Sequence, residues 1–212
     1  MSWTSCALVV GLGGAVWILW RLASRSRLLP CPASISWLVE MENPLARVTR
    51  SAQVIAQLGL GTGARVADVG CGPGRVTLPL GHAVGPTGKV VALDLQAEML
   101  AKLTAKAALQ RLTNIQPVCG DARERLLPEA SLDGAVMVMA LGEMPEPPRV
   151  IAQVYAALKP GGRLLMAESV FDPHFLRRKR VTAWAVAAGF VEQSCIGNGL
   201  AYTIVFTKPG RS

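Results

Sequence analysis

The chain has 212 residues, of which 51% are apolar and 5% aromatic, and its formal net charge is +8. This length suits one domain with a small appendage, and the apolar content excludes a disordered chain. Five cysteines without a Cys-x-x-Cys pair fit neither a zinc site nor a disulfide framework, so we expect reduced, mostly buried thiols, with Cys31 between two prolines as the most exposed one.

The first 20 residues contain no charged side chain and carry tryptophans near both ends. About 20 apolar residues cross the hydrocarbon core of a bilayer as a helix. The arginines of the following "RLASRSR" favour a cytoplasmic position for all that follows, so residues 1–27 are predicted to be a single-pass membrane anchor with a basic flank. A cleaved signal peptide is the alternative, but it would carry its positive charge before the apolar stretch.

Residues 28–58 are predicted to be a linker and lead-in helices. Pro30 and Pro32 prevent a helix in "LLPCPASIS", and the apolar spacing from residue 37 to residue 58 favours amphipathic helices with a break at Asn43-Pro44. The glycines of "GLGTGA" then open the main domain, residues 59–212.

In the main domain, short apolar runs alternate with helical patterns. The expected strands are 65–69, 89–95, 115–121, 132–141, 162–170, 190–199 and 201–209. The expected helices are 76–84, 96–112, 149–158 and 175–188, and the second of these has Leu109 among its inward-facing residues. This alternation predicts an α/β fold with a doubly wound parallel sheet, and the close spacing of the last two strands predicts an antiparallel pair at one edge.

The first strand is followed by the turn Gly70-Cys71-Gly72-Pro73-Gly74, with Asp68 two residues before it. Dinucleotide-binding turns follow G-x-G-x-x-G/A, and Arg75 stands where the third small residue would be. A carboxylate at this place repels a pyrophosphate but attracts a cationic amino group or a sulfonium. The pattern therefore indicates S-adenosylmethionine, which is positively charged and has no phosphate.

Two more acidic residues follow successive strands. Asp94 ends the second strand, 20 residues after Gly74, where a carboxylate can accept hydrogen bonds from both ribose hydroxyls. Asp121 follows the third strand and can accept one from the adenine amino group. Because buried carboxylates are costly without a partner, three of them at neighbouring strand ends favour a nucleoside site.

Four stretches resemble the class I S-adenosylmethionine-dependent methyltransferases, especially the small-molecule branch with the ubiquinone and menaquinone C-methyltransferases. They are "VADVGCGPGRVT", "VVALDLQAEML", "VCGDARERLLPEASLDGAVM" and "LKPGGRLLMAES", and the resemblance extends from Gly61 to Pro209. It implies a Rossmann-like sheet of seven strands, the last of them antiparallel. It also implies that Asp68 and the turn hold the methionine part, Asp94 the ribose and Asp121 the adenine edge, with Leu95 and Ala122 flanking the ring. The cofactor-binding residues are thus expected to be Asp68, Gly70, Cys71, Gly72, Gly74, Asp94, Leu95, Asp121 and Ala122.

Methyl transfer from a sulfonium is an in-line displacement with a good leaving group, so a general base matters only for a carbon or hydroxyl acceptor. Glu143, Glu168 and His174 follow or end strands and are the candidate catalytic residues. The segment "ALGEMPEPP" lacks the Pro-Pro-aromatic signature of enzymes that methylate amide or exocyclic nitrogens. The short segment between the fifth and sixth strands leaves no room for an inserted recognition domain, so a small or lipid-like acceptor is expected.

The sequence therefore predicts a membrane-anchored methyltransferase with S-adenosylmethionine as cofactor. A Rossmann-type NAD(P) oxidoreductase and a non-catalytic nucleoside-binding scaffold at the membrane are the alternatives. The basic run "RRKR" at 177–180 is expected to be the solvated face of a helix or to contact the membrane surface. The absence of an aromatic-rich basic motif argues against nucleic acid as a partner.

Overall fold

The computed structural model describes residues 31, 36 and 40–210. The expected membrane anchor at 1–27 and most of the linker after it lie outside these residues. Within the described part of the chain, no helix has both the length and the apolar character needed to cross a membrane.

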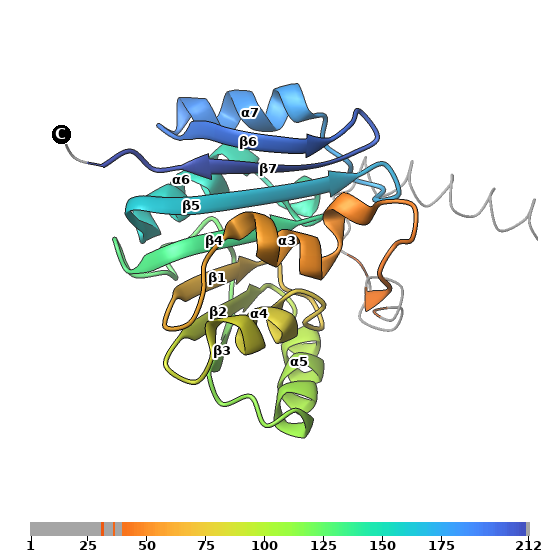
Figure 1. Ribbon diagram of the computed structural model, residues 1–212, viewed down its shortest axis with the longest axis vertical. Coiled ribbons are helices and arrows are strands. Elements are labelled where there is room, and N and C mark those ends of the chain that lie inside the picture. The colour runs from red at the N-terminus through yellow and green to blue at the C-terminus, as the bar shows by residue number, and fades with distance from the viewer. Residues whose placement is uncertain (1–30, 32–35, 37–39, 211–212) are drawn as a thin grey trace, which may run out of the picture.

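One mixed sheet of seven strands forms the centre of the molecule, in the order β3-β2-β1-β4-β5-β7-β6 (Figure 1). The strands are β1 Arg65–Val69, β2 Lys89–Asp94, β3 Ile115–Cys119, β4 Leu132–Val138, β5 Leu158–Ser169, β6 Val191–Gly197 and β7 Ala201–Thr207. The first five pair in parallel, and β7 runs antiparallel to both β5 and β6. The predicted seven-stranded doubly wound sheet with an antiparallel last strand is confirmed.

Helices cover both faces of this sheet. They are α3 Ser51–Leu58, α4 Thr77–Val84, α5 Ala97–Leu109, α6 Pro147–Ala157 and α7 Arg178–Ala187, with the short 3-10 helices η2 Arg47–Thr49 and η3 Leu141–Glu143. Figure 1 shows α3 and α4 in front of the sheet and α6 behind it. Successive strand residues point to opposite faces, so Val66 packs in the cluster under α3 and α4 while Ala67 packs in the cluster under α6 and α7.

The structure corrects several expected positions. Leu109 is 85% exposed, because α5 ends there. The helix expected from residue 175 begins at Arg178. The strand expected from residue 162 is β5, which begins four residues earlier, at Leu158. This early start arises because Leu158 pairs with Leu132 of β4, and Gly161 N–H donates to the Lys208 carbonyl at 2.8 Å, which extends the pairing with the chain after β7.

Cys31 is buried, contrary to the expected exposure. Its backbone N–H donates to Glu143 Oε2 at 3.1 Å, across 112 positions of sequence. Among the described cysteines the exposed one is Cys119, at the end of edge strand β3. The burial of Cys31 places the start of the described chain against the carboxyl ends of the parallel strands, where ligands of open α/β sheets bind.

Candidate functional site

A cavity of about 740 Å³ opens at the carboxyl edge of the sheet. Its walls come from the glycine turn after β1, the end of β2, the loop after β3, the segment 138–145 after β4 and the segment 171–173 after β5. Residues 41–45 of the lead-in segment and Cys31 complete it. The lining is mainly apolar with a few carboxylates, which is the usual composition of a small-molecule site.

The glycine turn is held tightly on two sides and open on the third. Gly70 N–H and Cys71 N–H both donate to the Leu93 carbonyl of β2, at 2.8 and 3.1 Å. A Cβ on Gly70 would lie 2.5 Å from Ala140 Cβ, and one on Gly74 would collide with Leu103. A Cβ on Gly72 would meet nothing within 4 Å, and Gly72 lines the cavity, so the turn leaves its backbone open to a ligand there.

Asp68 lies at the cavity wall but is only 2% exposed. The Thr77 hydroxyl donates to its Oδ2 at 2.6 Å. Burial raises the pKa of Asp68 to about 6, although Thr77 and nearby Arg75 oppose this shift. A cation nearby stabilises the ionised form of such a buried carboxylate, so Asp68 suits the ammonium or sulfonium group of a ligand.

Asp94 projects into the turn from the end of β2. Its Oδ2 accepts from Gly72 N–H at 2.8 Å and its Oδ1 from Gln96 N–H at 2.9 Å. Each carboxylate oxygen can accept more than one hydrogen bond. Asp94 therefore shapes the glycine turn and retains the capacity to accept from a diol in the cavity that it lines.

Asp121 forms an ion pair with Arg123, in addition to the predicted position at the adenine edge. Arg123 Nε lies 3.0 Å from both Asp121 oxygens, and its Nη2 donates to Oδ2 at 2.6 Å. Hydrogen bonds from Arg123 hold the pKa of Asp121 below its usual range, so the carboxylate stays charged. The pair is visible in sequence as "DAR", and Arg123 also lines the cavity. Leu95 and Ala122, the predicted ring contacts, line it as well.

The three candidate catalytic residues occupy different depths. Glu143, in η3, lines the cavity, whereas Glu168 and His174 are buried and absent from its lining. Burial and the neighbouring charge of Asp172 raise the pKa of Glu143 to about 8, and they raise the pKa of Glu168 well above its usual value. Glu168 Oε2 accepts from Leu176 N–H at 3.3 Å. The structure thus brings one of the three carboxyl and imidazole groups to the cavity wall and the other two behind it.

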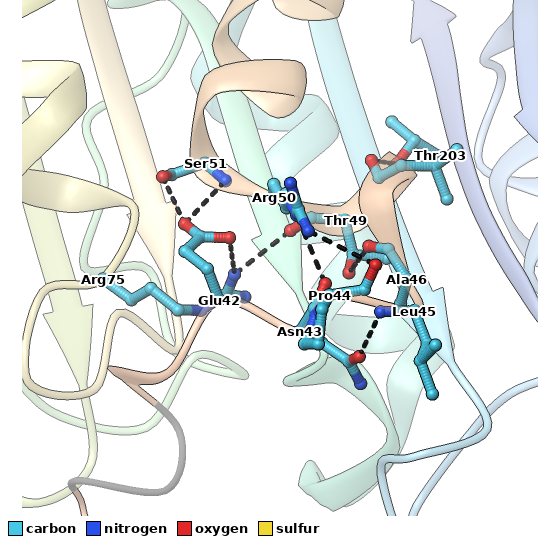
Figure 2. A network of polar contacts seen from close by, with 11 residues as sticks. Glu42, Asn43, Pro44, Leu45, Ala46, Thr49, Arg50, Ser51, Arg75 and Thr203 are labelled. Carbon is cyan, nitrogen blue, oxygen red and sulfur yellow. Dashed lines mark hydrogen bonds and ion pairs between the residues drawn. The ribbon is translucent and has the colours of Figure 1, made fainter.

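The lead-in segment is joined to the glycine turn by Arg75 (Figure 2). The Arg75 side chain is 9% exposed, donates from Nη1 to the Thr49 carbonyl at 3.1 Å and lies 3.7 Å from Glu42 Oε2. Glu42 Oε1 in turn accepts from the backbone N–H and hydroxyl of Ser51. In the sequence, Arg75 stands out only as a departure from the dinucleotide pattern, and nothing local to it indicates that it holds the lead-in segment.

These features fit S-adenosylmethionine. The buried Asp68 suits a cation, Gly72 leaves the turn open, and Asp94 can accept from ribose hydroxyls. Among the described residues that line the cavity, apolar side chains around Asp121 offer surfaces for a flat ring. The residues present therefore match the charge, polarity and shape of this cofactor, which contains no phosphate group.

Comparisons with known proteins agree with this fit. A family model described as a methyltransferase domain matches residues 66–162. The demethylmenaquinone methyltransferase of Lactococcus lactis subsp. lactis is 32% identical over 118 residues, which are 56% of this chain and 47% of that enzyme. The chain spans just under half the length of the first curated relatives that it matches.

Solved structures show the same fold. A SAM dependent methyltransferase from Aquifex aeolicus matches with a TM-score of 0.75 and 22% identity, over 84% of this chain and 100% of that chain. The cyclase SpnF matches with a TM-score of 0.69 and 19% identity, over 78% of this chain and 81% of that chain. At these identities the likeness concerns the fold, and the second name shows that this fold also serves another reaction.

Proposed function

We propose that the protein transfers a methyl group from S-adenosylmethionine to a small or lipid-like acceptor, as a class I methyltransferase. The match of residues 66–162 to a methyltransferase-domain model supports this proposal. One observation carries this proposal. A single, mainly apolar cavity is lined by the buried carboxyl of Asp68, the glycine turn, Asp94 and Glu143.

The cofactor supplies an activated methyl group on a positively charged sulfur. Asp68, Gly72 and Asp94 would bind its methionine and ribose parts, and Leu95, Asp121 and Ala122 its adenine. The chain's own contribution is to orient the acceptor and exclude water. The apolar walls, which include Met99, Met139 and Met144, suit that task.

Glu143 is the proposed general base. It lies at the cavity wall, and its pKa of about 8 makes it a stronger proton acceptor than an ordinary carboxylate when ionised. Its position suits removal of a proton from a hydroxyl or acidic carbon of the acceptor. Glu168 and His174 are buried behind the cavity wall. We propose that their protonation states set the electrostatic environment of Glu143 and Asp172.

The proposed acceptor is apolar and of quinone size. The name of the Lactococcus relative gives demethylmenaquinone as what that enzyme methylates. The mainly apolar lining of the cavity favours a ring or chain of this type over a charged metabolite. A menaquinone precursor is therefore the first acceptor to test.

Membrane attachment belongs to the same proposal. Residues 1–27 would anchor the protein as a single-pass segment, residues 28–58 would connect it, and residues 59–212 would lie on the cytoplasmic side. The uncharged stretch 1–20 and the arginines after it support this arrangement.

Two measurements test the proposed activity. Isothermal titration should show binding of S-adenosylmethionine and competition by S-adenosylhomocysteine. Incubation of the full chain with methyl-labelled cofactor and a membrane lipid extract should then yield a labelled lipid. Absence of heat and competition would contradict the proposal.

A non-catalytic or differently catalytic role is the second candidate, because the cyclase SpnF shares the fold. Cofactor binding without a labelled product in any extract would favour it. Fluorescence enhancement of NADPH on mixing would instead favour the oxidoreductase alternative, against which Arg75 in the glycine pattern argues.

A further inference from the structure

Large apolar side chains are exposed around the mouth of the cavity. We define the apolar rim as Met41, Leu45, Leu95, Phe171 and Leu200, which are between 47% and 79% exposed. The first four line the cavity. Leu200 lies beside Phe171, since its carbonyl accepts from Val170 N–H at 2.8 Å. Exposed apolar groups gathered at one opening mark an interaction surface more often than scattered ones do.

The other large apolar side chains that the described structure exposes lie elsewhere. Leu109 ends α5, Val186 is near the end of α7 and Val191 begins β6. The helices run back from the carboxyl edge, and β6 runs parallel to β5, so all three lie toward the amino edge of the sheet. They belong to none of the described cavity walls and serve as internal controls.

Basic side chains stand at the same edge as the apolar rim. Residues 177–180, "RRKR", are all exposed. They follow Leu176, whose carbonyl accepts from the Tyr202 hydroxyl at 2.8 Å, and Tyr202 pairs with Glu168 near the end of β5. Arg178 pairs at 2.6 Å with Glu192, which follows Val191 at the start of β6 and so draws the Arg178 head group toward the amino edge. Residues 177, 179 and 180 keep the run positively charged. Such a charge attracts anionic lipid headgroups.

The chain length before the described residues indicates what covers this surface. Cys31 lines the cavity, and only residues 21–30 separate it from the uncharged stretch 1–20. Ten residues span at most about 33–36 Å when fully extended. If that stretch lies in a bilayer, the cavity mouth stays within that distance of the membrane surface.

From these observations we propose that the apolar rim docks on the surface of a lipid bilayer, so that the acceptor enters the cavity directly from the membrane. The entry of the acceptor rests on the proposed methyl transfer, and the choice of a bilayer as the docking partner rests on the proposed anchor. Apolar side chains at the headgroup boundary lose water contact, and the basic run adds attraction to anionic lipids. The docked orientation faces the carboxyl edge toward the lipid and the amino edge toward water.

Photolabelling of the full chain in vesicles tests this orientation. The probe is a phosphatidylcholine with a diazirine near its headgroup, in vesicles with and without phosphatidylglycerol, followed by mass spectrometry of the labelled peptides. Labels are expected at the apolar rim, stronger with the anionic lipid, and not at Leu109 or Val191. Equal labelling of both edges, or labels confined to residues 1–30, would overturn the proposal. A dimer in solution whose rim stays unlabelled in the vesicles would assign the rim to an interface between two copies and would also overturn the proposal.

A matched pair of variants sharpens the test. Leu200→Asp should reduce rim labelling several-fold, because a charge then sits in the docking surface outside the cavity lining. Val191→Asp, on the same hairpin at the opposite edge, should leave labelling unchanged, and equal effects of the two would count against docking. Both variants should keep their affinity for S-adenosylmethionine, which reports folding. Rim labelling without methyl transfer would reject the proposed function alone, and methyl transfer without rim labelling would reject this inference alone.

Discussion

Asp68, Asp94 and Asp121 occupy equivalent strand ends, yet their surroundings give them different tasks. Asp68 is buried with a raised pKa, Asp94 accepts two backbone N–H groups, and Asp121 is fixed by Arg123 with a lowered pKa. A carboxylate that is costly to bury gains from a cation, whereas one already paired with arginine gains little. The strongest preference for positive charge in the cavity is therefore at Asp68.

Asp94→Ala should weaken cofactor binding by about 1.5–3 kcal/mol, roughly 10- to 150-fold in Kd, because hydrogen bonds to a charged acceptor are lost. Isothermal titration measures the change. Asp133→Ala is the control, since Asp133 pairs with Lys159 and Arg65 N–H at the start of β4, at the amino edge. An unchanged Kd for Asp94→Ala would remove the proposed ribose contact.

Glu143→Gln should abolish a rise in activity with pH. The raised pKa of about 8 keeps Glu143 protonated below that pH, and only its ionised form accepts a proton. For the unaltered protein kcat/KM should therefore increase up to about pH 8 and then level off. Glu98→Gln, on the exposed face of α5, should keep that profile. A profile that Glu143→Gln leaves unaltered would assign the base elsewhere.

At the scale of elements, the glycine turn and the lead-in segment act as one unit. Arg75 follows the turn and holds Thr49 and Glu42, while the Thr203 hydroxyl of β7 donates to the Val48 carbonyl at 2.6 Å. The lead-in segment is thus fixed both to the turn and to the sheet. This explains how residues 41–45 come to line the cavity.

Substitution by alanine should mainly lower stability at Gly74 and mainly lower cofactor affinity at Gly72. Both have positive φ, 52° and 98°, which costs a residue with a Cβ about 1–2 kcal/mol. In Gly74→Ala the methyl group also collides with Leu103, and overpacking adds about 1–3 kcal/mol. Urea unfolding should show the larger loss of stability for Gly74→Ala, and titration the larger loss of cofactor affinity for Gly72→Ala. Equal losses of both quantities would contradict the assigned roles.

Most elements of the fold follow from local pattern. The strand β1 was predicted with its observed bounds. The helices differ from the prediction by a few residues at their ends. The exposed Leu109 and the late start of α7 show that the apolar spacing extends past the ends of the helices themselves. Spacing records which residues could share a face, and the neighbouring elements decide where that face ends.

At the scale of the whole molecule, buried acids gather at the carboxyl edge. Asp68, Glu143 and Glu168 all have pKa values raised mainly by burial. Asp121 and Asp133 have lowered pKa values and are ionised above pH 5 in both the folded and the unfolded chain. Between pH 5 and pH 8, among these acids, only the raised ones bind protons differently in the two states.

Stability should therefore fall as the pH rises from 5 to 8. A raised pKa means that the folded state binds more protons, so its contribution is complete below the unfolded pKa and is lost as the pH passes the folded one. Each tenfold difference in proton affinity corresponds to about 1.4 kcal/mol. Urea unfolding at several pH values measures the slope, and Glu168→Gln should flatten it while retaining an acceptor for Leu176 N–H. A slope of the opposite sign would show that these carboxyls are ionised in the folded state.

The sequence by itself determined the α/β alternation, the tight glycine turn and the acidic residues at the strand ends, because each depends on neighbours a few positions away. It also sufficed to predict the cofactor, since the carboxylate beside the turn repels a phosphate, two further acids follow the next strands, and four stretches resemble a methyltransferase family. Only the tertiary structure decided that Cys31 is buried against Glu143, that Arg75 holds the lead-in segment, and that Glu143 reaches the cavity while Glu168 and His174 lie behind it. These features join residues far apart in the chain, and such contacts depend on how packed elements meet at the sheet edge, which no local periodicity records.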